Sequence, residues 1–176
     1  MKKILILLFL FTLYSATKAQ EKSDRNIQVG LVFQKAAYLY WENGLGIKYT
    51  CKSLFDKKLQ LKAQAVSSTL GSALGSTALN QHSFTGGAEW LFGKSNLQIP
   101  VGFNAGYFWV DYEHPAFDVL PSGSILFSIE TGLNYRFDFP VTLSATAGYN
   151  LISGNGVDVP GSLFPVFFKL GLFYRL

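Results

Sequence analysis

The chain has 176 residues, of which 49% are hydrophobic and only 15% are charged, whereas charged residues make up roughly 25% of an ordinary soluble domain. Beyond the first twenty residues no run of 18 apolar residues occurs, which argues against a helix that spans a membrane. The formal net charge is +4 at pH 7. Whether this positive charge lies in the folded domain or in an N-terminal segment decides whether the composition favours binding to nucleic acid.

Residues 1–19 are expected to be a secretory signal peptide. Lys2 and Lys3 precede the apolar stretch "ILILLFLFTLY", and the small residues Thr17 and Ala19 stand at the positions that a signal peptidase requires. An uncleaved membrane anchor is the alternative, but the apolar stretch is short for a span. Cleavage after Ala19 leaves a single domain, residues 20–176.

The positive charge lies mainly in this N-terminal segment. Cleavage removes three lysines and no acidic residue, so 12 Lys and Arg are left against 11 Asp and Glu, a net charge of +1. Binding to nucleic acid then has no compositional support. Cys51 is the only cysteine, which excludes an intramolecular disulfide.

The remainder of the chain alternates apolar and polar residues with the period of two that indicates β-strands. In chain order, the alternating segments are 26–33, 44–52, 58–65, 83–92, 97–109, 125–137, 141–151 and about 163–176. Their lengths suit strands that cross a bilayer at a tilt. Pro100 and Pro165 fall near strand ends, where a missing backbone donor is tolerated.

The connections between these segments alternate in length. Residues 53–58, 93–96 and 138–140 read as short turns, and residues 36–43, 68–81, 111–123 and 152–162 read as long loops. This pattern predicts an all-β fold, an eight-stranded antiparallel up-and-down transmembrane β-barrel. A soluble eight-stranded barrel would turn its apolar face inward, but the polar face here has too few charges to meet water. We therefore expect the apolar face to contact lipid.

The polar face would then line the lumen. Its charged residues are expected to form a buried network of ion pairs with water among them, because an unpaired buried charge is costly. The predicted members are Lys48, Lys62, Glu89, Glu130, Arg136, Lys169 and Arg175. A narrow polar path that favours anions is the alternative interpretation.

The chain ends on its last strand, in the sequence "KLGLFYRL". A closed barrel needs such a strand to pair with the first one. Lys169, Gly171, Tyr174 and Leu176 resemble the C-terminal recognition signal of outer-membrane barrels, although Leu176 replaces the commoner Phe or Trp. The resemblance implies recognition by the barrel-assembly machinery during insertion.

The whole mature chain resembles the small eight-stranded outer-membrane barrels, the size class of outer-membrane proteins A, X and W. The segment "KAQ" at residues 18–20 is similar to exported proteins of the Bacteroidetes. The resemblance implies an integral protein of the outer membrane, a monomer in contact with membrane lipid and lipopolysaccharide, with a structural or surface-interaction role and no cofactor. A narrow channel for small solutes is the alternative.

A lipid-modifying enzyme is the further alternative. His82 and Ser83 are neighbours on a strand, so they face opposite sides and cannot act as a nucleophile and its base. His114 lies near Asp111 and Ser122, but no glycine-framed nucleophile accompanies it. We therefore expect no enzyme.

The predicted loops differ in charge from the predicted turns. The outer loops contain Glu42, Asp111, Glu113, Asp118 and Asp158, whereas the periplasmic turns contain Lys57, Lys58 and Lys94. Solubility explains this difference, and weak bridging by divalent cations is the alternative. Aromatic residues at both rims are expected to form interfacial girdles, namely Tyr38, Tyr40, Trp41, Trp90 and Trp109.

Overall fold

The computed structural model describes residues 26–36, 41–51, 58–71, 77–93, 96–112, 122–152 and 165–176. These residues form eight strands: β1 (Ile27–Ala36), β2 (Trp41–Thr50), β3 (Leu59–Gly71), β4 (Thr77–Phe92), β5 (Leu97–Tyr112), β6 (Gly123–Arg136), β7 (Val141–Ile152) and β8 (Val166–Arg175). Within these ranges no helix is long and apolar enough to cross a membrane.

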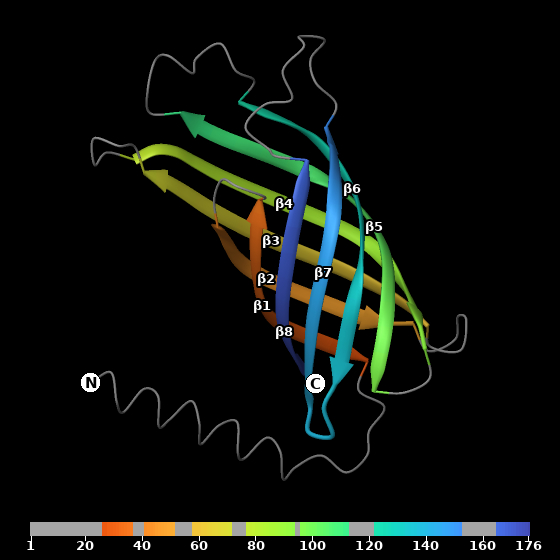
Figure 1. The fold of residues 1–176 in the computed structure, drawn as a ribbon. Coiled ribbons are helices and arrows are strands. Elements are labelled where there is room, and N and C mark those ends of the chain that lie inside the picture. Colours follow the sequence, from red (N-terminus) through yellow and green to blue (C-terminus); the bar gives the residue numbers. More distant parts are fainter. Residues whose placement is uncertain are drawn as a thin grey trace, which may run out of the picture.

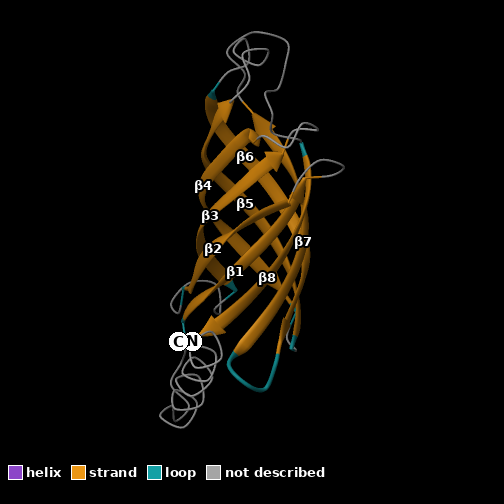
Figure 2. Cartoon of the chain, turned by 90° about the vertical axis from the view of Figure 1, so that its left-hand side faces the viewer, coloured by secondary structure: helices purple, strands orange, loops and turns teal. Residues whose placement is uncertain are grey.

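The strands pair in chain order, always antiparallel, and close into a barrel (Figures 1 and 2). The eight-stranded up-and-down fold predicted from the sequence is confirmed. Closure is made by β1 and β8, and the final residue contributes, because the Leu176 N–H donates to the Ile27 carbonyl at 2.9 Å. The last strand therefore has partners on both sides, as a barrel without edges requires.

The register of the pairs sets the tilt of the strands. A path through paired residues that starts at Ala36 and passes through every strand returns to β1 at Asn26, ten residues away. A stagger of ten in eight strands corresponds to a tilt of about 40° from the barrel axis. Residues on different strands can therefore meet inside the barrel although they occupy different heights along their own strands.

The side chains follow an inside-out distribution. Most large apolar residues of the outward face are between 38% and 64% exposed, and Leu45 is the most exposed of them. The inward face is buried and mostly polar, rich in Gln, Asn, Ser and Thr, with a smaller set of apolar side chains such as Val32, Phe108 and Phe173. A water-soluble barrel has the reverse arrangement, so the outer surface is that of a membrane-embedded barrel.

Three of the predicted loops are shorter than the sequence suggested, and the loop predicted at residues 111–123 changes least, because β5 continues to Tyr112 and β6 begins at Gly123. β2 begins at Trp41 and β3 continues to Gly71, so only residues 37–40 and 72–76 separate these strands from their neighbours. The serine- and glycine-rich stretch after Val66 looked like a loop, but strand pairing depends on backbone groups, which small residues supply as well as large ones. The expected loop boundaries at residues 36–43 and 68–81 are therefore wrong.

The extension makes β4 and β5 the longest strands, at 16 residues each. At the inferred tilt this corresponds to about 40 Å along the barrel axis, more than the roughly 25 Å apolar band of an outer-membrane barrel. The outward face changes accordingly: Thr69, Asn80 and Asp111 form one paired row of polar residues. This row marks where the apolar belt ends.

Pro100 is the fourth residue of β5, and pairing with β6 lapses at Ile99 and Pro100. The Thr131 hydroxyl donates to the Pro100 carbonyl at 3.0 Å, which supplies a bond where the ladder is interrupted. Pro165 immediately precedes β8 and accepts the Asn150 N–H at 2.6 Å. Both prolines thus lie where the sequence placed them, near strand ends.

Several predicted features lie outside the described residues. They are the signal peptide at residues 1–19, the aromatic residues Tyr38 and Tyr40, His114 with Glu113 and Asp118, Asp158, and the turn residues Lys57 and Lys94. These stay predictions.

Candidate functional site

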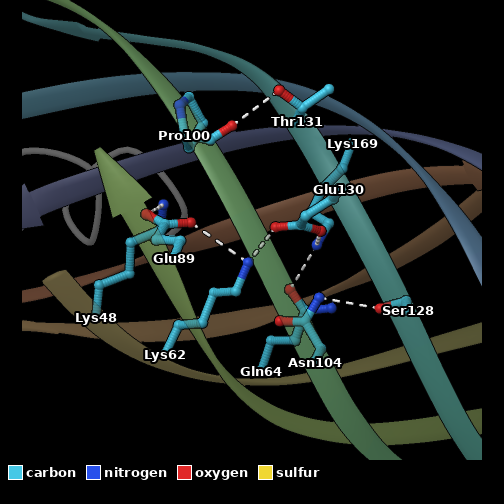
Figure 3. Close-up of polar contacts among 10 residues, drawn as sticks. All are labelled: Lys48, Lys62, Gln64, Glu89, Pro100, Asn104, Ser128, Glu130, Thr131 and Lys169. Atoms are coloured by element: carbon cyan, nitrogen blue, oxygen red, sulfur yellow. Dashed lines mark hydrogen bonds and ion pairs between the residues drawn. The ribbon is translucent and has the colours of Figure 1, made fainter. Parts of the chain in front are cut away.

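Five of the seven predicted lumen residues lie together. Lys48 is on β2, Lys62 on β3, Glu89 on β4, Glu130 on β6 and Lys169 on β8. Their inward direction follows from strand parity, because alternate residues point to the same face. The stagger then brings side chains from five strands to one level of the lumen (Figure 3).

These five residues, called here the ion network, form an unbroken chain of alternating charge. Lys48 Nζ donates to Glu89 Oε1 at 2.7 Å, and Lys62 Nζ donates to Glu89 Oε2 at 3.3 Å. Lys62 Nζ also donates to Glu130 Oε1, and Lys169 Nζ donates to Glu130 Oε2 at 2.5 Å. All four carboxylate oxygens are therefore bonded to an ammonium group.

The ion network is almost completely shielded from solvent. Its side chains are between 1% and 8% exposed. Ions in such surroundings stabilise a fold only when their mutual attraction offsets the loss of hydration, which amounts to several kcal/mol per ion. The alternation of charges along the chain provides that attraction.

Phe173 lies inside the barrel next to the ion network. Its ring covers inward glycines: a Cβ on Gly46 would lie 3.1 Å from Phe173 Cε1, and a Cβ on Gly171 would collide with the same ring. Lys48 Nζ lies 4.7 Å from the centre of this ring, within the range of a cation–π contact. With Val32 and Val66, Phe173 forms an apolar cluster inside the barrel.

The structure does not bring the other two predicted members into the ion network. Arg175 lies at the turn end of the barrel, where its Nη2 donates to the carbonyls of Phe137 and Phe139 at 2.7 and 2.6 Å. Arg136 is the last residue of β6, at the same end and half-buried. The structure therefore brings five of the seven predicted residues together and places the other two at the turn end, because parity fixes the face of a residue and not its height in the barrel.

Glu42 is a lumen residue that sequence reasoning assigned to an outer loop. It is the second residue of β2 and only 1% exposed. Gln34 Nε2 donates to Glu42 Oε2 at 2.5 Å, and Gln81 Nε2 donates to Glu42 Oε1 at 3.1 Å. Its alternation with Gly44 and Gly46 on the inward face was the signal that could have identified it.

The outward face carries few groups capable of chemistry. His82 and Ser83 face opposite sides, and the His82 ring lies 5.5 Å from that of Trp109. Trp41 and Trp109 are exposed on the outward face, where interfacial girdles were expected. Among the described residues no group of three or more His, Cys, Asp or Glu could hold a metal ion.

Comparison with solved structures finds this fold in small outer-membrane barrels. Neisserial surface protein A matches with a TM-score of 0.60 and 14% identity, over 85% of this chain and 96% of that one. The N-terminal β-barrel domain of Pseudomonas aeruginosa OprF matches with a TM-score of 0.55 and 15% identity, over 86% and 98%. Ail, the attachment invasion locus protein of Yersinia pestis, matches with a TM-score of 0.50 and 13% identity, over 86% and 97%.

The fold is that of a small outer-membrane β-barrel. No protein-family model matches the chain, and no curated protein sequence matches it. At these identities the likeness shows the fold alone, so the role of the barrel has to be argued from its own lumen and surface.

Proposed function

We propose that the chain is an integral protein of the bacterial outer membrane with a structural or surface-interaction role, a scaffold whose lumen is closed by the ion network. The supporting observation is the burial of that network: five charged side chains from five strands meet across the lumen, each no more than 8% exposed. A water-filled path would hydrate these groups instead.

Conductance in planar lipid bilayers tests the closed lumen. The chain, purified from membranes in detergent, is expected to give no steady conductance above the bare bilayer. A porin that is known to conduct, measured in the same bilayers, shows that the assay detects an open lumen. Steady conductance by the unchanged chain would replace the scaffold role with the channel.

We propose that lipopolysaccharide contacts the end of the barrel that carries Lys35. On the described strands Lys35 is the one Lys or Arg whose side chain points outward, and its Nζ lies 5.2 Å from the Trp41 ring. Trp41 is 57% exposed, in the position of an interfacial aromatic. An ammonium group at this level attracts the phosphates of lipid A.

Binding of purified lipopolysaccharide to the chain in detergent tests this contact. Lys35→Ala is expected to weaken binding, whereas Lys58→Ala, at the opposite end of the barrel, is expected to leave it unchanged. Equal binding by the two variants would reject the assigned contact.

Three parts of the proposal, namely export, membrane insertion and bacterial origin, depend on the sequences near the two ends of the chain. We propose export through residues 1–19 and insertion by the barrel-assembly machinery, guided by Lys169, Gly171, Tyr174 and Leu176. The proposed origin in the Bacteroidetes depends on residues 18–20 alone.

A monomer is proposed because the apolar belt meets lipid on all sides.

We propose no catalytic role. His82 is on the outward face beside Trp109, away from Ser83. Mass spectrometry of lipid A from cells with the unchanged chain and with His114→Ala tests this statement. The two profiles are expected to be identical, and a difference in acylation would point to an enzyme.

A further inference from the structure

We propose that a cavity beside the ion network binds one small monovalent anion of the size of chloride. The cavity has a volume of about 20 Å³. A cavity of about 10–15 Å³ accommodates one water molecule, so this cavity holds a single particle of that size or slightly larger. Its polar lining comes from Lys48, Lys62, Gln64, Glu130, Ser144, Thr146 and Lys169.

The first argument is an excess of hydrogen-bond donors. Each protonated lysine has three N–H donors and no acceptor, so Lys48, Lys62 and Lys169 bring nine donors to the cavity. They make five hydrogen bonds to other described residues, four to carboxylate oxygens and one to Gln64 Oε1 at 3.1 Å. A halide accepts hydrogen bonds and donates none, which matches this excess.

Thr146 provides a second argument, independent of the lysines. It lies on β7, lines the cavity and is 7% exposed. Its Oγ1 makes no hydrogen bond to any of the described residues. In the β7–β8 register Thr146 stands opposite Lys169, so a neutral donor and a cation flank the cavity from neighbouring strands.

The charge balance of the lumen agrees with an anion. The ion network holds three ammonium groups, of Lys48, Lys62 and Lys169, against the two carboxylates of Glu89 and Glu130. Glu42 does not line the cavity, and both of its oxygens are bonded by Gln34 and Gln81. A buried excess of positive charge is costly, and an anion among the lysines reduces it.

The size of the cavity selects among anions. Chloride and bromide are slightly larger than a water molecule and match a cavity of about 20 Å³, whereas sulfate, phosphate and lipid headgroups are too large for it. The proposed ligand class is therefore a monovalent halide-sized ion, enclosed during folding because the surrounding side chains are almost unexposed.

The direct test is a crystal structure of the chain refolded in sodium bromide. Bromine scatters anomalously, so a bound ion is expected to give one anomalous peak in the cavity between Thr146 and the three lysines. Absence of a peak there, or peaks confined to the outer surface, would overturn the proposal in favour of water.

A second test compares two threonines of β7. Thr142 also points inward, is 3% exposed and has an Oγ1 without a partner among the described residues, but it does not line the cavity. The thermal midpoint of unfolding is measured in chloride, bromide and sulfate at equal ionic strength, for the unchanged chain, Thr146→Val and Thr142→Val.

The unchanged chain and Thr142→Val are expected to show a midpoint that rises and saturates with chloride or bromide, relative to sulfate. Thr146→Val is expected to need about tenfold more halide for the same rise, because one hydrogen bond to the anion is lost. Either valine substitution can change the midpoint itself, so the halide dependence is the deciding quantity. No saturation in any variant, or the same dependence in all three, would overturn the proposal.

Discussion

Replacing Glu130 by glutamine is the sharpest test of the ion network. Glu130 accepts hydrogen bonds from Lys62 and Lys169 and is 6% exposed. The substitution keeps the shape of the side chain but removes the charge that both ammonium groups face. Breaking a buried ion pair by removing one partner costs about 3–5 kcal/mol, because the other charge is left buried without compensation. We expect Glu130→Gln to lower the free energy of unfolding by about this amount.

Glu42→Gln is the matched control, since Glu42 is as deeply buried but is bonded to the amides of Gln34 and Gln81 and to no lysine among the described residues. The loss there is limited to weaker hydrogen bonding, about 1–2 kcal/mol. Urea unfolding in lipid vesicles, followed by the fluorescence of the three tryptophans, measures both variants. Equal losses for the two variants would refute the claim that ion pairing holds the lumen together. The double variant Glu130→Gln/Lys169→Met is expected to recover part of the loss, because it also removes Lys169, whose one carboxylate partner among the described residues is Glu130, whereas Lys62 keeps its bond to Glu89.

The other predictions concern the terminal strand and the two faces of the barrel. Deletion of Tyr174–Leu176 removes two of the nine residue pairs between β8 and β1 and the bond from Leu176 to Ile27, and the truncated chain is expected to stay in the periplasm and be degraded; membrane fractionation checks this, and insertion in a protease-resistant form would contradict it. Phe173→Ala is expected to cost about 3–5 kcal/mol in urea unfolding because it leaves a cavity in the lumen. Phe168→Ala, on the outward face of the same strand, should cost much less because lipid fills the space; a smaller loss for the lumen variant would contradict the assigned faces. Ile129→Arg, on the lipid face, is expected to destabilise the barrel by about 2–4 kcal/mol in the same assay, and an unchanged stability would mean that this face meets water.

The face of each strand residue could be predicted from the sequence because strand parity depends only on local alternation. Lys62 and Glu130 were both assigned to the lumen for this reason. Their contact could not be predicted, since it joins β3 to β6 and depends on the stagger of the whole barrel. Arg136 shows the same limit: its face followed from the pattern, but its height at the turn end did not.

Glu42 shows where local signals mislead. The sequence "WENG" contains Asn43 and Gly44, which usually indicate a turn. In the structure Gly44 lies within β2, where a Cβ would collide with the backbone of Ala65 and the side chain of Val66. The glycine permits close approach of β2 to β3, and the strand continues on its N-terminal side through Glu42 and Asn43, which the expected loop 36–43 had included.

The position of the charges also explains how the barrel fixes its register. A slip of one residue between neighbouring strands would turn an entire strand over and carry its polar side chains to the lipid face. For β3 such a slip would place Lys62 in hydrocarbon. It would also leave Glu130 in the lumen without Lys62, one of its two lysine partners. Membrane exposure of a lysine near the bilayer midplane costs about 2–4 kcal/mol, and the unpaired carboxylate adds to that cost. Because the ion network draws one residue from each of β2, β3, β4, β6 and β8, each of these strands is fixed in this way. The network is therefore expected to disfavour barrels with a slipped register, in addition to its contribution to the native one.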